Sequence, residues 1–403
     1  MILKIVLFAN TEWYLYNFRR SLALGLRAGG HEVVLVSPPG PYGQKLQELG
    51  FRWIAAPMER RSLNPLREIA LVNWLHRLLV AERADLVHGF TIKCAVYGSL
   101  AGRLARRADG LPARVNAVAG MGYVFTSHDL KARLLRPVVR SLMRLALNGD
   151  SARLILQNPD DMALFERAGL LDSARTHLIP GSGVDCTKFA PPEAEISAAG
   201  QAARLRVVFP ARLLWDKGLA EFVTAARLLK SEGRAIDFLL AGTPDPGNPA
   251  AVPEATVQGW VDEGLLQWLG HVTDMPALFR SVDVVALPSY REGLPKGLIE
   301  AGACARALVT TDVPGCHEVV RDGIDGLLVP VRDGKSLARA IARLHDDPAL
   351  RQRLGAAARV KALAEFDERI VIRRTCEVYA LALPGFSAAG TPVSQLNGQP
   401  ANL

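Results

Sequence analysis

The sequence predicts an α/β protein made of two doubly wound, Rossmann-like domains that face a cleft. Short apolar runs rich in β-branched residues alternate with amphipathic stretches, which is the pattern of βαβ units around a parallel sheet. The pattern stops at a segment rich in Pro, Ala, Glu and Gly, residues 190–203, and then starts again. A length of 403 residues also exceeds one ordinary core and suits two domains.

The first domain is predicted over residues 1–190. It opens with a strand at Ile2–Phe8, because Lys4 interrupts that apolar run and no small-residue cleavage site follows, which argues against a signal peptide. Further strands are expected near residues 31–37, 51–56, 84–90, 113–120 and 154–158. No run of 18 uninterrupted apolar residues occurs in the chain, so we expect no transmembrane helix.

The second domain is predicted over residues 204–365, after a linker at residues 191–203. Its strands are expected near residues 205–211, 235–242, 265–272, 281–287 and 307–314. Residues 366–383 are expected to form a final helix, and the polar tail 384–403 is expected to be disordered. Because doubly wound sheets bind ligands at the carboxyl ends of their strands, the active site is expected in the cleft.

The net charge of +8 is uneven along the chain. Residues 1–190 hold 25 Lys and Arg against 15 Asp and Glu, whereas the remainder holds 23 against 25. A basic half is typical of a domain that meets an anionic surface. We see no nucleic-acid-binding motif, so an anionic membrane is preferred to nucleic acid. Ordinary solubilising charge remains the alternative.

The five cysteines are scattered, with no C-x-x-C pair: Cys94, Cys186, Cys304, Cys316 and Cys376. This spacing favours reduced thiols in the cytoplasm over a disulfide framework or a metal site.

The richest stretch of the chain places two carboxylates, Glu292 and Glu300, eight positions apart. Between them lies a turn, Gly293–Leu294, followed by Pro295, a residue favoured at the first position of a helix. We therefore expect a strand at residues 281–287, a loop at 288–294 and a helix at 295–306. Free backbone N–H groups at this helix start would bind phosphate beside Glu292, and Glu300 would reach along the helix flank. A nucleotide sugar has that layout: hexose, diphosphate, ribose.

Two cations, Arg212 and Lys217, follow the expected strand at residues 205–211. A cation at a helix start opposes the helix dipole, so the pair is better explained by a bound diphosphate than by surface charge.

The ends of two N-terminal strands carry candidate acceptor-binding residues. Asn10, Trp13 and Arg19 lie in an aromatic and polar segment that follows the first strand. His88 and Lys93 follow the strand near residues 84–90 and are expected to face the cleft. Packing of the aromatic residues and a structural role for His88 remain open alternatives.

These motifs resemble a known family, the retaining glycosyltransferases of family 4. Glu292 to Glu300 resembles its E-x7-E element, and Arg212 to Gly218 resembles its R-x4-K-G element. Other residues follow the same family pattern: Pro288, Ser289, Gly293, Pro295, Ala301, Asp312, Gly315, Glu318, Gly323 and Gly326. The segments 10–19, 88–93 and 116–125 resemble the subgroup that builds capsule, O-antigen and other polyprenyl-diphosphate-linked oligosaccharides. Ala119 stands where many members have histidine, which leaves the donor sugar open.

The resemblance implies the GT-B fold, with a C-terminal helix that crosses back to the first domain. It implies retaining transfer of a hexose or N-acetylhexosamine from a UDP-sugar to a lipid-linked saccharide. The donor diphosphate would be bound by Arg212 and Lys217, the sugar hydroxyls by Glu292 and the ribose by Glu300. The backbone at Gly270 would hold the nucleobase, with His271 as a neighbour. Gly120 would join the acceptor site.

The chain has no D-x-D motif placed as a metal site, so we expect neither an essential metal nor a cofactor. Two other functions remain open. A nucleotide-sugar 2-epimerase of the same architecture would need no acceptor, and a non-catalytic glycan- or membrane-binding scaffold would not turn over.

Residues 131–148 are predicted to form an interfacial membrane helix. Basic residues at 131, 133, 136, 140 and 144 give it a cationic face with no acidic residue, and leucines and valines fill a broad apolar face. A helix packed on its own sheet is the alternative. The membrane hypothesis predicts a cytoplasmic protein that lies peripherally on the inner face of the cytoplasmic membrane.

Overall fold

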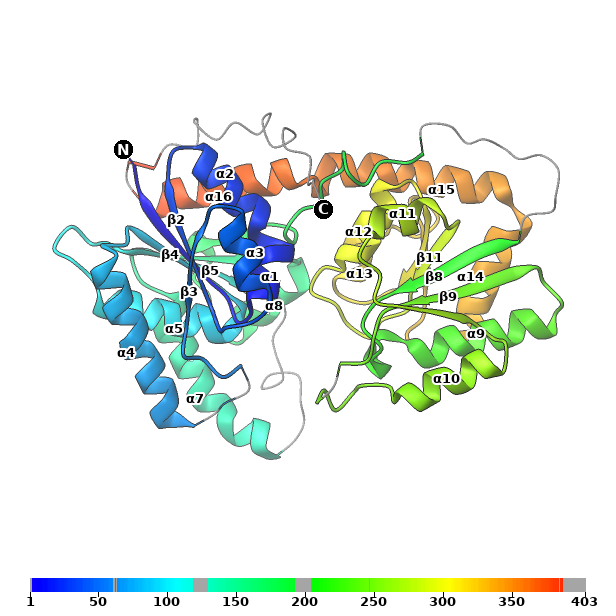
Figure 1. Cartoon of the computed structure of the whole chain (residues 1–403), viewed down its shortest axis with the longest axis horizontal. Helices are drawn as coiled ribbons and strands as arrows, with labels where there is room; N and C mark the ends of the chain where they lie inside the picture. The colour runs from blue at the N-terminus through cyan, green and yellow to red at the C-terminus, as the bar shows by residue number, and fades with distance from the viewer. Residues whose placement is uncertain are drawn as a thin grey trace. The chain divides into compact units, whose positions relative to one another are not determined.

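The computed structural model of the chain describes residues 2–118 except 61 and 63, residues 130–192, residues 204–383 except 246, and residues 385–386. The chain forms two compact units, which are Met1–Gly183 with Arg369–Leu403, and Val184–Glu368 (Figure 1). Most of the predicted linker, residues 193–203, lies outside the described residues.

The N-terminal unit contains a seven-stranded parallel sheet in the order β3-β2-β1-β4-β5-β6-β7. The strands are β1 Lys4–Phe8, β2 Glu32–Ser37, β3 Arg52–Ala55, β4 Leu86–Phe90, β5 Ala113–Val118, β6 Ala152–Leu156 and β7 Thr176–Leu178. Helices cover both faces, which explains why the central strands are apolar at nearly every position instead of alternating. The order of the strands reverses between β1 and β4, so the loops that follow these two strands are neighbours.

Alternate residues of β1 point into two separate cores. Ile5 and Leu7 pack under α2, α3 and α16, whereas Val6 and Phe8 pack under α4 and α5. The helical elements of this unit are α1 Glu12–Tyr14, η1 Leu15–Arg19, α2 Arg20–Ala28, α3 Tyr42–Glu48, α4 Pro65–Ala81, α5 Thr91–Leu104, α7 Leu130–Leu147, α8 Pro159–Arg167 and η2 Ser173–Arg175. Elements α1, η1 and α2 follow one another without a break, and η1 is a π-helical turn.

The last helix, α16 Glu368–Ala382, returns to the N-terminal unit, as the GT-B resemblance implies. Val371, Ile372 and Tyr379 share a buried cluster with Leu7 and Phe90. The same cluster includes Phe386, which stacks on His31 with ring centroids 4.8 Å apart. The prediction that the tail is disordered from residue 384 is therefore wrong for Phe386, because an aromatic side chain there completes the core.

The C-terminal unit contains a six-stranded parallel sheet in the order β10-β9-β8-β11-β12-β13. Its strands are β8 Leu205–Pro210, β9 Ile236–Ala241, β10 Gln267–Gly270, β11 Val284–Leu287, β12 Ala307–Thr311 and β13 Leu327–Val329. One core runs through both faces of this sheet. The order reverses between β8 and β11, and this switch point is where such sheets bind ligands.

The helices of this unit connect its strands and follow the last of them. They are η3 Trp215–Lys217, α9 Leu219–Ser231, α10 Glu254–Asp262, α11 Met275–Arg280, α12 Lys296–Ala303, α13 Cys316–Val319, α14 Gly334–Asp346, α15 Pro348–Lys361 and η4 Ala362–Phe366. In the part of the chain that the structure describes, no helix is both long and apolar enough to span a bilayer.

Candidate active site

The loops that follow β8 and β11 meet because these strands are hydrogen-bonded neighbours. At their contact Gly218 has φ +80°, and a Cβ there would collide with the carbonyl oxygen of Pro288. Only glycine combines this backbone conformation with so close an approach. The close contact with the Glu292 loop therefore explains why the motif ends in glycine at position 218.

The contact brings Lys217 and Glu292 together. The Lys217 Nζ lies 2.5 Å from Glu292 Oε1, and the Ser289 hydroxyl donates to the same oxygen at 2.7 Å. The two charged side chains are partly buried, with 19 % and 12 % of their surface exposed. An ammonium has three N–H donors and a carboxylate has two oxygens, so both groups retain capacity for a ligand.

The backbone of the Glu292 loop is held at several points. Tyr290 N donates to Asp216 O at 2.9 Å, and Glu292 N donates to Pro314 O at 3.1 Å. The Thr311 hydroxyl donates to Ser289 O. Gly315, at φ +86°, lies so close to the backbone of Glu292 that a side chain would collide there. A loop restrained in this way positions its carboxylate before any ligand arrives.

Arg212 follows β8 on the same edge of the sheet. Its Nη1 lies 2.7 Å from Asp245 Oδ2, in a loop that follows β9. Gly242 directly follows β9, and a Cβ there would collide with the carbonyl oxygen of Ala211. Arg212 is predicted from its sequence motif. Asp245 is not, because it lies 33 positions away and belongs to no motif that links it to the arginine.

Helix α12 begins at Lys296, with Pro295 as its N-cap residue and Gly293 and Leu294 just before it. Glu300 lies inside the helix, as predicted, and Lys296 Nζ is 3.6 Å from its Oε1. Burial raises the pKa of Glu300, against the opposing effect of the Lys296 ammonium. The Glu300 carboxyl group is partly buried, with 14 % of its side chain exposed, and its oxygens can form hydrogen bonds with a hydroxyl-rich ligand.

Gly270 ends β10 at φ +65°, and its carbonyl oxygen accepts a 2.8 Å hydrogen bond from Gly242 N. The space beside its Cα is open, and the next residue, His271, is exposed. Both therefore lie at the carboxyl edge, where the family resemblance places the nucleobase.

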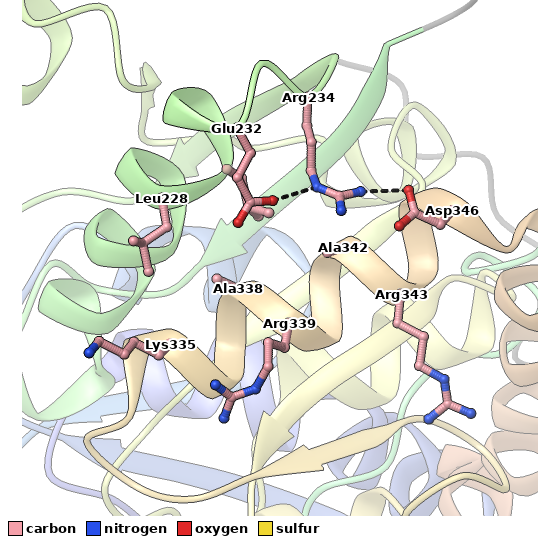
Figure 2. Close-up of a pocket in the computed structure, with 10 residues that line it drawn as sticks. Leu228, Glu232, Arg234, Lys335, Ala338, Arg339, Ala342, Arg343 and Asp346 are labelled. Atoms are coloured by element: carbon pink, nitrogen blue, oxygen red, sulfur yellow. Dashed lines mark hydrogen bonds and ion pairs between the residues drawn. The ribbon is translucent and has the colours of Figure 1, made fainter.

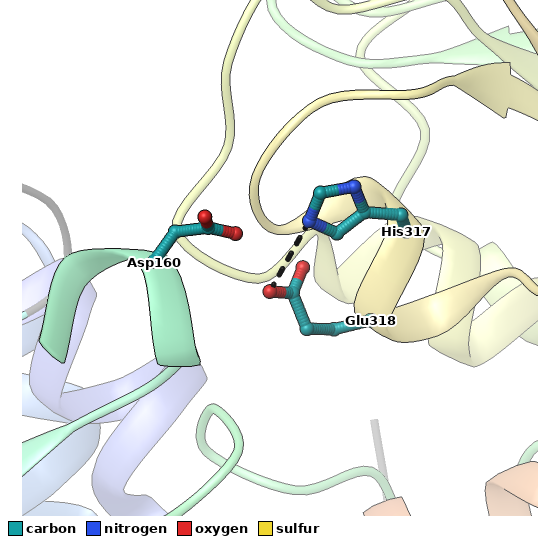
Figure 3. Close-up of side chains that lie close together, drawn as sticks. All are labelled: Asp160, His317 and Glu318. Atoms are coloured by element: carbon teal, nitrogen blue, oxygen red, sulfur yellow. Dashed lines mark ion pairs between the residues drawn. The ribbon is translucent and has the colours of Figure 1, made fainter. Parts of the chain in front are cut away.

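A histidine that the sequence analysis did not single out lies close by on the short helix α13. His317 Nδ1 is 2.8 Å from Asp312 Oδ1. Its Nε2 is 3.5 Å from Glu318 Oε1, the ion pair drawn in Figure 3. Glu318 Oε2 accepts from Gly315 N at 2.6 Å. The third residue drawn in Figure 3, Asp160, belongs to α8 of the N-terminal unit.

In the N-terminal unit, the predicted acceptor segment forms α1 and η1. Trp13 is exposed and packs edge-on against Phe18, with ring centroids 5.3 Å apart. Arg19 is only 5 % exposed, yet among the described residues no carboxylate pairs with it. Its Nη2 donates to the Tyr14 hydroxyl at 2.9 Å, and its guanidinium lies 4.4 Å from the centroid of Phe90. Asn10 lies just beyond β1 and is partly exposed.

Two predicted acceptor residues are not open to a ligand. His88 is only 1 % exposed, and its Nδ1 shares a 2.7 Å hydrogen bond with the Tyr379 hydroxyl. Lys93 Nζ bonds Glu59 O at 2.8 Å, Ser62 O at 3.2 Å and Glu68 Oε1 at 2.9 Å. The prediction that both face the cleft is wrong, because the His88 ring is buried and the contacts of Lys93 use all three donors of its ammonium. Only Nδ1 of the His88 ring is hydrogen-bonded; its buried Nε2 has no partner among the described residues.

Other features lie apart from these residues. Gly120 lies outside the described residues, as do the side chains in the N-terminal part of the predicted membrane helix. A groove between α9 and α14 is lined by none of the predicted site residues (Figure 2). In this groove Arg234 forms two ion pairs, with its Nε 2.7 Å from Glu232 Oε2 and its Nη1 2.5 Å from Asp346 Oδ1.

Comparison with known sequences identifies relatives of both units. Residues 17–182 match the family described as "Glycosyl transferase 4-like domain", and residues 204–347 match "Glycosyl transferases group 1". The chain is 30 % identical over 372 residues to N,N'-diacetylbacillosaminyl-diphospho-undecaprenol alpha-1,3-N-acetylgalactosaminyltransferase of Campylobacter jejuni, covering 91 % of this chain and 95 % of that protein. It is 26 % identical over 318 residues to UDP-Gal:alpha-D-GlcNAc-diphosphoundecaprenol alpha-1,3-galactosyltransferase of Escherichia coli, covering 77 % of this chain and 79 % of that protein.

Solved structures share the fold at low identity. A glycosyltransferase of Rickettsia africae superimposes with a TM-score of 0.75 at 18 % identity, covering 95 % of this chain and 99 % of that one. HepE of Anabaena, solved with UDP-glucose, has a TM-score of 0.75 at 20 % identity, covering 94 % and 99 %. The two family matches, the relative that is 30 % identical over 91 % of this chain and the two doubly wound sheets all indicate the same family. The chain therefore belongs to the group 1 glycosyltransferases, family 4, and is a glycosyltransferase of the GT-B fold.

Proposed function

We propose that this protein transfers a hexose or N-acetylhexosamine, with retention of configuration, from a UDP-sugar to a polyprenyl-diphosphate-linked saccharide during surface polysaccharide synthesis. The observation that carries the proposal is the Lys217–Glu292–Ser289 cluster at the switch point of the C-terminal sheet. Similarity to two transferases named for diphospho-undecaprenol acceptors, over 91 % and 77 % of this chain, supports the choice of acceptor.

The cluster suits departure of a diphosphate from a sugar. Arg212 and Lys217 are cations at the carboxyl edge, and the positive end of the α12 dipole would add to their attraction for phosphate oxygens. Preorganised positive charge stabilises the negative charge that develops on the leaving diphosphate. Glu292 Oε1 is already engaged by Lys217 and Ser289, which leaves Oε2 to orient the sugar hydroxyls. Glu300 would bind the ribose, with Gly270 and His271 beside the base.

In the N-terminal unit, we assign acceptor binding to Asn10, Trp13 and Arg19. The Arg19 guanidinium is buried, and no carboxylate of the described residues pairs with it. Such a group suits the acceptor diphosphate, since charge-assisted bonds to phosphate are strong in a dry site. The exposed indole of Trp13 offers a stacking surface for a sugar.

Helix α7 supports contact with an anionic membrane. Its outward side chains Val138, Leu142 and Leu145 are exposed, whereas Met143 and Ala146 are buried. Exposed apolar residues on a helix without acids are typical of an interfacial helix. Part of its basic face is used inside the unit, because Arg144 Nε donates to Gly169 O at 2.7 Å.

The test is transfer of radiolabel from a panel of UDP-sugars to a bacterial lipid extract, with the wild type and Glu292→Ala. We expect one donor to label the lipid phase and the variant to lose this transfer. Glu254→Ala, at an exposed position in the first turn of α10, is the matched control. UDP binding without transfer to any lipid would reject the lipid acceptor, and conversion of UDP-N-acetylglucosamine alone would favour the epimerase.

A further inference from the structure

We propose that Tyr290 is a positioning residue for Glu292, acting through a hydrogen-bonded link to Glu221 at the start of α9. The inference rests on the proposed function, in which Glu292 contacts the donor sugar. Neither the sequence motifs nor the pattern of charges singles out this link, because Glu221 and Tyr290 are 69 positions apart.

The link is formed by one hydroxyl and one carboxylate. The Tyr290 Oη donates to the Glu221 side chain, with its oxygen 2.9 Å from Oε1 and 3.1 Å from Oε2. Burial, and then the hydrogen bond to Glu221, raise the pKa of the phenol, so it stays protonated and can donate. Charge-assisted hydrogen bonds of this kind are stronger than neutral ones.

The ring of Tyr290 is also held on its face. The Arg332 guanidinium lies 4.8 Å from the ring centroid, in the loop between β13 and α14. Arg332 has φ +61°, a left-handed conformation that a residue with a side chain adopts at a cost. A backbone conformation of this kind is kept only where the surrounding structure holds it. In this loop it accompanies the contact between the Arg332 guanidinium and the Tyr290 ring.

Both ends of the link lie close in the chain to the two residues of the Lys217–Glu292 pair. Glu221 lies in the first turn of α9, four residues after Lys217, and Tyr290 lies two residues before Glu292. Tyr290 N is bonded to Asp216 O, next to Lys217. The phenol therefore ties the loop that carries the carboxylate to the segment that carries the ammonium. Loss of the tie would let Glu292 move relative to the sugar while the phosphate-binding cations remain in place.

The experiment compares Tyr290→Phe, Glu221→Ala and Glu221→Gln with the wild type by calorimetric binding of UDP and of UDP-N-acetylgalactosamine, and by thermal unfolding. The first two variants remove the link, whereas Glu221→Gln retains an oxygen that accepts from the phenol. Tyr42→Phe, at a half-buried tyrosine of α3 in the N-terminal unit, is the matched control.

We expect Tyr290→Phe and Glu221→Ala to weaken sugar-nucleotide binding by about fivefold while UDP affinity changes by less than about twofold, as loss of one hydrogen-bonded link predicts. Glu221→Gln should retain most of the wild-type affinity for the sugar nucleotide. The unfolding temperatures of all the variants should match that of the wild type. Equal loss for both ligands, no loss, or a wild type that binds both ligands equally would overturn the proposal. A wild type that does not bind UDP would instead reject the proposed donor site.

Discussion

Lys217 Nζ lies 2.5 Å from Glu292 Oε1, although 75 positions separate the two residues in the chain. The family resemblance implies a separate part of the donor for each residue, with the lysine on the diphosphate and the glutamate on the sugar. Under the proposed function, their direct contact would make the two subsites adjacent and electrostatically coupled. Neither charge can be removed without changing the surroundings of the other.

Lys217→Met is expected to lower UDP affinity about tenfold or more, because a desolvated cation is lost from the diphosphate subsite. The double variant with Glu292→Gln should lose less than the two single effects combined, since the residues form one pair. Calorimetric titration of UDP measures both effects. Lys335→Met, on α14 beside the groove of Figure 2, should bind UDP as the wild type does.

Ser289→Ala is expected to lower kcat about fivefold to thirtyfold. The fully buried hydroxyl donates to Glu292 Oε1 at 2.7 Å, and its removal frees the carboxylate to change rotamer. UDP affinity should change little, because UDP lacks the sugar that Glu292 orients. Initial rates over a range of donor concentrations separate kcat from KM, and Ser141→Ala on α7 is the control. An unchanged kcat would mean that Glu292 keeps its position without the Ser289 hydroxyl.

Gly218→Ala is expected to destabilise the protein by about 2–4 kcal/mol, because the new Cβ would collide with Pro288 O at a left-handed backbone position. Gly233→Ala is a matched control, with φ +70° and open space beside it, and should cost only about 1 kcal/mol. Denaturant unfolding followed by circular dichroism gives both values. Equal costs would show that the loops after β8 and β11 separate easily.

The free energy of unfolding is expected to fall as the pH drops below 6.5, in part through His88. Burial, and then the Arg19 cation, hold the pKa of His88 well below its ordinary 6.5 in the folded state. The unfolded chain therefore binds a proton that the folded chain does not, and stability rises with pH through this range. His88→Gln should flatten the dependence between about pH 5 and pH 6.5. Urea unfolding at a series of pH values makes the comparison.

The double substitution Leu142→Ser with Leu145→Ser is expected to reduce binding to phosphatidylglycerol vesicles by about tenfold, because two exposed apolar side chains of α7 are lost. Leu381→Ser, at an exposed leucine of α16, is the control. Vesicle sedimentation measures the bound fraction. A wild type that binds neither these vesicles nor neutral phosphatidylcholine vesicles would contradict the membrane hypothesis.

The sequence by itself determined the two doubly wound sheets and the loops that carry Arg212, Lys217, Glu292 and Glu300, but not the last strand of either sheet. These strands, β7 and β13, have only three residues each, too few to give a clear apolar pattern. The predicted features depend on local signals. Apolar runs mark buried strands, and Pro295 marks the start of α12 within one residue. The return of the last helix to the first unit followed from the family resemblance, and the buried Tyr379 confirms it.

Tertiary structure alone decided which of these side chains meet. Lys217 pairs with Glu292, Tyr290 reaches Glu221, and Arg212 reaches Asp245. It also decided that His88 and Lys93 are enclosed, since their partners come from a distant helix or from neighbouring loops. The physical reason is the same in each case. A strand pattern states that a residue lies at the carboxyl edge of a sheet, but only packing between elements fixes which donors, acceptors and charges surround it there.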